Sequence, residues 1–167
     1  VLPWSTLVNY VSLIPKPDGG LRPITLMPMM YRLWLLARAP ELQHWEAKEA
    51  GYWDDAVRGS SALQAALVRA LRIETDRAQN KTTAAIYWDM EKFYDTLSLK
   101  KVLEAARRLH YPPRLLAVGA IAHIAPCLLK IRGSFGNPVM VSTGIKAGCR
   151  QAMHFARLLL YSVLRRA

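Results

Sequence analysis

Two turn signals divide this chain and restrict the folds open to it. Pro17-Asp18-Gly19-Gly20 and Gly133-Ser134-Phe135-Gly136-Asn137-Pro138 combine proline, which presets φ, with glycine, which permits positive φ. Strand-like sequence flanks each turn, at Asn9–Lys16 and Leu21–Leu26 for the first and Leu128–Arg132 and Val139–Thr143 for the second. Helical patterns lie between them without a strand–helix–strand repeat. We therefore predict an α+β fold in which antiparallel hairpins pack with helices.

Helical periodicity covers much of the remaining sequence. The expected helices are Met29–Ala50, Leu63–Asn80, Ser98–Leu109, Pro112–Ile124 and Gln151–Arg166. Pro40 is expected to split the first near Ala39, because proline removes a backbone donor and clashes with the preceding turn. Ser60 or Ser61 is expected to cap the second helix, and its apolar stripe should face the core. That stripe is Leu63, Ala66, Leu67, Ala70 and Leu71.

The segment Thr82–Met90 joins β-branched, small and aromatic residues and predicts a buried strand that ends at Asp89. A carboxylate at the end of an apolar strand is costly unless it has a partner. A Mg²⁺ ion is one such partner, because hard cations prefer oxygen ligands. The alternative is that Asp89 only caps the following turn.

Charge is distributed unevenly along the 167 residues. The formal net charge is +11, but residues 1–104 carry 13 Lys and Arg with all 12 Asp and Glu, a net of +1. Residues 105–167 carry 10 Lys and Arg and no acid. This balance favours a polyanionic partner. Two cysteines exclude a disulfide scaffold, and the uncharged run 115–129, which no other run exceeds in length, is too short to span a bilayer.

Several motifs follow one another in the order of a known enzyme family. Trp88-Asp89-Met90-Glu91-Lys92-Phe93-Tyr94-Asp95 resembles motif A of reverse transcriptases. The hairpin from Leu13 to Ile24 resembles the fingers hairpin of that family, and Gly59-Ser60-Ser61 resembles the helix start before motif A. Gly144-Ile145-Lys146-Ala147-Gly148-Cys149 resembles motif B. The chain is most similar to the non-LTR retroelement and group II intron type.

The resemblance implies a domain layout and a set of site residues. It implies fingers over about 1–57, palm with motif A over about 58–110, a return to the fingers over about 111–146 and a palm helix after motif B over about 147–167. Asp89 would be the catalytic aspartate and, with the main-chain carbonyl of Met90, a ligand of two Mg²⁺ or Mn²⁺ ions. The residues implied for binding the dNTP are Lys16, Arg22, Tyr94 and Gly148. Tyr94 would be the aromatic steric gate against a ribose 2′-OH.

The sequence also departs from the family pattern. Ala147 replaces the usual glutamine of motif B, and Arg150-Gln151-Ala152 replaces the serine-proline that usually follows it. No carboxylate follows Glu104, so the chain cannot supply the family's Asp-Asp motif. The chain is therefore expected to be part of an RNA-directed DNA polymerase, with an RNA template and a DNA primer as partners, and inactive in synthesis by itself. Such partners favour the nucleus or the cytoplasm over secretion.

Two other interpretations stay open. One is a catalytically dead, retroelement-derived module that binds RNA or DNA through the basic last third of the chain. Its candidate cations are Arg107, Arg108, Arg114, Lys130, Arg132, Lys146, Arg150 and Arg157. Their phosphate contacts would make binding salt-dependent. The other is a basic helical adaptor with no role toward nucleic acid.

Overall fold

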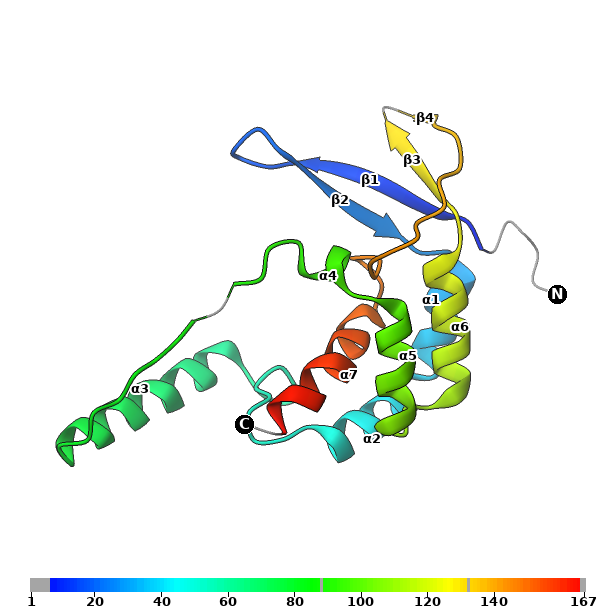
Figure 1. Cartoon of the computed structure of the whole chain (residues 1–167). Coiled ribbons are helices and arrows are strands. Elements are labelled where there is room, and N and C mark those ends of the chain that lie inside the picture. The colour runs from blue at the N-terminus through cyan, green and yellow to red at the C-terminus, as the bar shows by residue number, and fades with distance from the viewer. Residues whose placement is uncertain (1–6, 88, 132, 166–167) are drawn as a thin grey trace.

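The structure is a computed structural model that describes residues 7–87, 89–131 and 133–165. A sheet with strand order β2-β1-β3-β4 lies above a body of helices, and helix α3 (Ala62–Ala78) projects away from that body (Figure 1). The α+β class predicted from the sequence is confirmed. No helix within the described ranges combines the length and apolar character needed to cross a bilayer.

The first turn signal forms the predicted hairpin. Strands β1 (Asn9–Pro15) and β2 (Leu21–Leu26) are antiparallel, with Ile14 opposite Arg22. At the turn, the Lys16 amide donates to the Gly20 carbonyl at 2.7 Å, and Gly19 adopts a φ of +82°. Proline and glycine thus set this reversal locally.

The second turn signal forms a tighter hairpin than predicted. Strand β3 (Cys127–Ile131) pairs with β4 (Ser134–Phe135), because the chain reverses at once at Gly133, where φ is +90°. The predicted strand Val139–Thr143 is wrong, since Val139 alone of that segment forms a bridge, to Cys127. Strand β1 also lies parallel to β3, a pairing between segments far apart in the chain.

The predicted helix boundaries are largely confirmed. The break foreseen at Pro40 separates α1 (Met29–Ala37) from α2 (Ala39–Glu49), where the missing proline amide falls in the first turn and costs little. The Ser61 hydroxyl accepts a hydrogen bond from the Gln64 amide at 3.1 Å and caps α3. The other helices are α4 (Phe93–Thr96), α5 (Leu99–Arg108), α6 (Pro113–Ile124) and α7 (Ala152–Leu164).

The core lies between α1, α2, α5, α6 and α7. Four of these helices contribute residues with no exposed surface: Leu35 from α1, Val102 from α5, Leu115 from α6, and Phe155 and Leu158 from α7. Helix α2 contributes the buried Leu42 and Trp45. On α5 the buried residues are Val102, Ala105 and Ala106. This core fixes the helices beneath the sheet, and so the loops that join the two.

The region from α3 to Met90 differs from the prediction. Ala65 is the buried residue of α3, while Leu63 is 80% exposed and Leu67 is 56% exposed. The predicted buried strand over 82–90 is wrong for its described residues, which form no strand and are exposed. A strand needs a neighbour to bond, and no described strand lies beside this segment.

Candidate functional site

The fingers-like hairpin places two basic side chains beside its turn. Lys16 follows β1 and Arg22 lies in β2, and both are exposed. The Asp18 carboxylate accepts a hydrogen bond from the Gly20 amide at 3.1 Å, so it stabilises the turn between them. The hairpin tip therefore presents two cations on a short, well-bonded reversal.

The motif B-like loop, Gly144–Cys149, packs directly against β2. The Thr25 amide donates to the Ala147 carbonyl at 3.0 Å. Gly148 has a φ of +96°, and a Cβ there would lie 2.6 Å from the Thr25 carbonyl oxygen. Only glycine adopts this conformation without strain and permits this approach of two backbones. The glycine of the motif is thus required by its contact with the hairpin.

The motif A-like segment meets the same loop from the other side. The Ile145 amide donates to the Tyr94 carbonyl at 2.7 Å, and the Gly144 amide donates to the Leu97 carbonyl at 3.1 Å. A Cβ at Gly144 would lie 2.9 Å from the Asp95 carbonyl oxygen. Backbone hydrogen bonds thus connect the hairpin, the motif B-like loop and the α4 region, three segments that are distant in the sequence.

Tyr94 and Asp89 lie in different surroundings. Tyr94 is half-buried at the edge of the core, with its ring 5.4 Å from that of Phe93. Asp89 and Met90 are exposed on the segment that leads from α3 to α4, and Trp88 lies outside the described residues. The hydrogen bonds that connect Tyr94 to the motif B-like loop therefore do not include Asp89.

The metal predicted from the resemblance needs more ligands than this segment offers. The Asp89 carboxylate and the Met90 carbonyl are oxygen donors of the type that Mg²⁺ accepts. However, the described residues contain no group of three His, Cys, Asp or Glu side chains placed to hold a metal ion. Residues 89 and 90 alone do not form a site for two ions.

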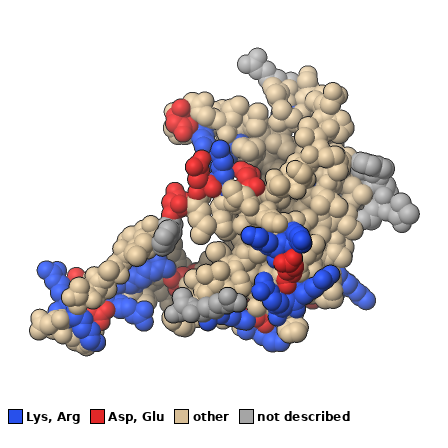
Figure 2. Space-filling view, in the orientation of Figure 1, with Lys and Arg blue, Asp and Glu red and all other residues tan. Residues whose placement is uncertain are grey.

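The predicted nucleic-acid-binding cations separate into exposed and buried groups. Arg107, Arg108, Arg114, Lys130 and Arg150 are exposed, whereas Lys146 and Arg157 are buried. Arg132 lies outside the described residues. Figure 2 shows Lys and Arg gathered over the projecting region and the lower part of the body. The surface available to a polyanion in this fold excludes the two buried cations.

The ammonium group of Lys146 is buried and bonds to main-chain carbonyls. Its ammonium donates to the Ala122 carbonyl at 3.2 Å and the Ala125 carbonyl at 2.5 Å, at the C-terminal end of α6. Its amide donates to Nδ1 of His123 at 3.0 Å. Burial lowers the pKa of Lys146, and burial with the nearby ammonium lowers the pKa of His123 to about 3. Lys146 therefore caps a helix and holds a neutral histidine.

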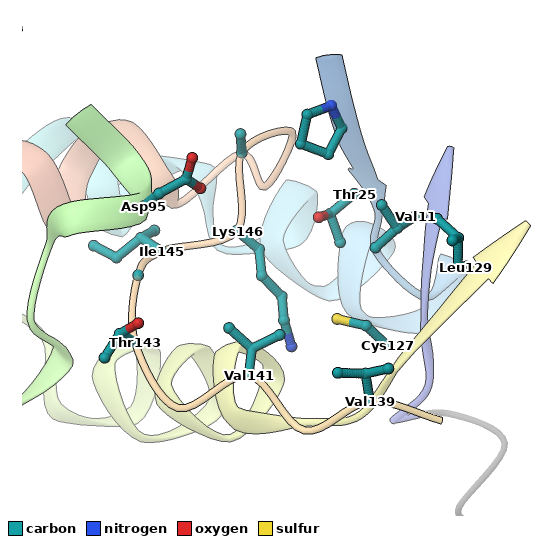
Figure 3. Close-up of a pocket in the computed structure, with 13 residues that line it drawn as sticks. Val11, Thr25, Asp95, Cys127, Leu129, Val139, Val141, Thr143, Ile145 and Lys146 are labelled. Carbon is teal, nitrogen blue, oxygen red and sulfur yellow. The ribbon is translucent and has the colours of Figure 1, made fainter. Parts of the chain in front are cut away.

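A cavity of about 320 Å³ opens between the sheet and this loop. In Figure 3 the Lys146 side chain extends from the loop into the cavity, and Asp95 lies near the other end of the cavity. Most of its wall is apolar and includes Val11, Leu129 and Val141. Ala147 also lines it.

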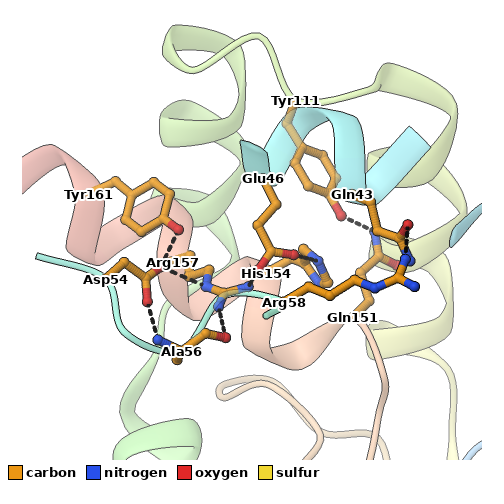
Figure 4. Close-up of polar contacts among 10 residues, drawn as sticks. All are labelled: Gln43, Glu46, Asp54, Ala56, Arg58, Tyr111, Gln151, His154, Arg157 and Tyr161. Atoms are coloured by element: carbon orange, nitrogen blue, oxygen red, sulfur yellow. Dashed lines mark hydrogen bonds and ion pairs between the residues drawn. The ribbon is translucent and has the colours of Figure 1, made fainter. Parts of the chain in front are cut away.

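Arg157 is the centre of a buried ionic network that the sequence did not reveal (Figure 4). Its guanidinium lies 2.7 Å from the Glu46 carboxylate and 3.1 Å from the Asp54 carboxylate, and it donates to the Ala56 carbonyl at 2.5 Å. The Tyr161 hydroxyl donates to Asp54. The network joins α2, the 51–59 loop and α7, so Arg157 positions the helix that follows the motif B-like loop.

Gln151 is a second buried residue with a positioning role. Its side-chain oxygen accepts from the Tyr31 hydroxyl at 2.8 Å, and its amide donates to the Tyr111 hydroxyl at 2.8 Å and the Leu115 carbonyl at 2.9 Å. Burial raises the pKa of both tyrosines, so both hydroxyls stay protonated, Tyr31 as a donor to Gln151 and Tyr111 as an acceptor from it. From the sequence, Gln151 was only a departure after motif B; the structure shows it joining α1, α6 and α7.

No protein-family model and no curated protein matches this sequence. Two solved structures of telomerase from Candida tropicalis have a similar fold. Apo telomerase truncated from its C-terminal domain matches with a TM-score of 0.62 and 18% identity, over 98% of this chain and 39% of that one. Telomerase in complex with a TWJ fragment of telomeric RNA matches with a TM-score of 0.62 and 15% identity, over 96% and 32%.

Telomerase is a reverse transcriptase-related enzyme, so the chain has a reverse-transcriptase-like fold. It spans well under half the length of both telomerase chains. The resemblance inferred from motif A, motif B and the hairpin is thereby confirmed at the level of fold. The assignment of individual site residues and the division into fingers and palm remain predictions.

Proposed function

We propose that this chain is the fingers and partial palm of an RNA-directed DNA polymerase of the non-LTR retroelement or group II intron type. One observation carries the proposal. Backbone hydrogen bonds from Thr25 to Ala147 and from Ile145 to Tyr94 join the hairpin, the motif B-like loop and the motif A-like segment. These are the segments that the resemblance assigns to nucleotide binding, and they meet in a fold shared with telomerase.

Each proposed residue has a physical role in positioning a nucleotide. Lys16 offers a compact charge and Arg22 a planar fork, and the two suit the phosphates of a dNTP. Tyr94 would lie against the sugar, where an aromatic ring leaves no space for a 2′-oxygen. Gly148 lets the loop approach β2 and the nascent base pair. Asp89 and the Met90 carbonyl would contribute to a magnesium site together with oxygen donors that the described residues do not supply.

A second candidate function is nucleic-acid binding without synthesis. The exposed face of α5 favours it: Lys100, Lys101, Arg107 and Arg108 surround a single acid, Glu104. Arg114 extends this basic surface to the start of α6. A phosphate backbone would bind there without any catalytic group.

Nucleotide binding separates the two candidates. The chain is mixed with an annealed RNA template and DNA primer, and a fluorescent dNTP is titrated in. For the polymerase module we expect nucleotide binding that Lys16→Ala and Arg22→Ala each weaken about tenfold, while affinity for the template–primer is retained. Lys48→Ala, which removes an exposed cation on α2, is the matched control.

The other outcomes are equally clear. If the chain binds template–primer but no nucleotide, binding without synthesis is the correct function. Under that function, charge reversal at Arg107 and Arg108 should weaken nucleic-acid binding and reduce its salt dependence. If the chain binds neither nucleic acid nor nucleotide at low salt, both candidates are wrong.

A further inference from the structure

The two faces of the four-stranded sheet differ in what they contact. Strand register places Asn9, Val11, Thr25 and Cys127 on the face toward the helices, and Asn9, Thr25 and Cys127 are at most 8% exposed. The opposite, outward face carries alternate residues of the same strands. They are Tyr10, Ser12, Ile14, Arg22, Ile24, Leu26, Leu128, Lys130 and Phe135.

Two aromatic rings form a pair on this outward face. Tyr10 in β1 and Phe135 in β4 have ring centroids 5.4 Å apart, with their planes tilted by 49°. Tyr10 is 40% exposed and Phe135 is 54% exposed. A single exposed aromatic residue is ordinary on a protein surface. Two in contact, on a sheet that holds their backbones in register, present an apolar surface that is fixed in shape.

The same surface is positively charged. Lys130 pairs with Phe135 across β3 and β4, and its ammonium lies 5.7 Å from the centre of the Phe135 ring. Arg22 is the other cation of the outward face. All four strands lie within the described residues, and their outward positions include no acid; Asp18 lies at the hairpin turn and is bonded to Gly20. Flat apolar groups together with negative charge would complement this surface.

We propose that Tyr10, Phe135 and Lys130 form a stacking platform for the bases of a single-stranded nucleic acid. Bases would stack on the two rings, and Lys130 would pair with an adjoining phosphate. A single strand fits because its base faces are free, whereas in a duplex they are covered by neighbouring bases. The proposal rests on the proposed function and specifies which form of nucleic acid the sheet binds.

The test compares leucine substitutions with a matched aromatic control. Tyr10→Leu and Phe135→Leu keep an apolar side chain but remove the π face, so they separate stacking from hydrophobic contact. Tyr52→Leu removes an aromatic residue that is 92% exposed in a loop away from the sheet. Binding to a fluorescent single-stranded oligonucleotide and to a duplex of the same sequence is measured by anisotropy over a range of salt.

We expect each platform variant to lose about tenfold in affinity for the single strand, within the range for one lost base stack. Duplex affinity and the salt dependence should stay unchanged, and Tyr52→Leu should bind like the original chain. Lys130→Ala should lower the slope of log affinity against log salt by about one. Tyr10→Phe keeps the ring and should restore single-strand binding.

The proposal is overturned if both leucine variants bind the single strand within about twofold of the original chain while that chain still binds. It is also overturned if Tyr10→Leu abolishes self-association on sedimentation, because the face would then cover a second copy. Failure of the original chain to bind any nucleic acid would instead refute the proposed function. Circular dichroism of each variant establishes that the comparison is made between folded proteins.

Discussion

Helices α7 and α3 both carry apolar side chains, but the fold buries the two helices to very different extents. Six of the 13 residues of α7 are buried, whereas Ala65 is the buried residue among the 17 of α3 (Figure 1). Yet α3 has the Ser61 side-chain cap and α7 has none. Local signals suffice to begin a helix, but most of the stability of a helix in a protein comes from the surface that it buries.

The charged side chains of these two helices differ in burial in the same way. Arg157 of α7 lies between two carboxylates in the interior, while Arg69 of α3 pairs with Asp55 at 2.6 Å on the surface. Water screens the surface ion pair and weakens it. The buried charges have little contact with water, so they depend on one another for stabilisation. The two regions should therefore respond very differently to equivalent substitutions.

The largest difference is expected for the two arginines. Arg157→Met leaves Glu46 and Asp54 without their buried partner and should lower the free energy of unfolding by about 3–5 kcal/mol. Arg69→Met should lower it by about 0–1 kcal/mol. Urea unfolding followed by circular dichroism measures both. Equal losses would show that the interior network is not stabilised as its burial indicates.

Leucine truncation compares the apolar surfaces directly. Leu158 of α7 has no exposed surface, and Leu158→Ala should cost about 2–5 kcal/mol through lost burial and the cavity left behind. Leu67 of α3 is 56% exposed, and Leu67→Ala should change stability by about 0.5 kcal/mol or less. The same urea experiment applies. A large loss at Leu67 would mean that α3 buries its stripe in solution.

Residues 62–87 contain no histidine, whereas burial lowers the pKa of two histidines of the body, His154 and His123. Acid should therefore destabilise the body, in part through His123. Its folded pKa of about 3 is below the ordinary value, so the unfolded chain binds more protons between those values. The contribution of His123 is complete above about pH 6.5 and is lost as the pH falls toward 3, amounting to roughly 2 kcal/mol between pH 7 and pH 5.

Unfolding of the original chain and His123→Gln at these two pH values tests this expectation. The variant keeps a side-chain acceptor near the Lys146 amide but cannot be protonated, so its stability should fall less with acid. His44→Gln changes an exposed histidine and serves as the control. An unchanged pH dependence in His123→Gln would contradict the role assigned to that residue.

Elements with a local cause were predictable from the sequence. The hairpin at Pro17–Gly20, the break at Pro40 and the cap at Ser61 depend on residues within a few positions of one another. Motif order also predicted a reverse-transcriptase-like fold, which the structural comparison confirmed. The approach of Gly148 to β2 is foreshadowed in the sequence only by a glycine within a recognised motif.

The candidate site was less accessible to sequence reasoning. The strand predicted over 82–90 does not form in its described residues. A strand needs a neighbouring strand to bond, and the residue pattern of one segment does not show whether such a neighbour exists. Lys146 and Arg157 were counted with the surface cations because charged residues are seldom buried without partners. Their partners, the carbonyls at the end of α6 for Lys146 and Glu46 with Asp54 for Arg157, come from distant parts of the chain.

The sequence by itself determined where helices and turns begin, because caps, prolines and glycines act on their own backbone. It also determined the basic character of the last third of the chain. Only the tertiary structure decided which charged side chains are buried, which apolar helix faces pack against the core and which strands pair with one another. The parallel pairing of β1 with β3 places Tyr10 near Phe135, and such a pairing depends on packing between distant segments.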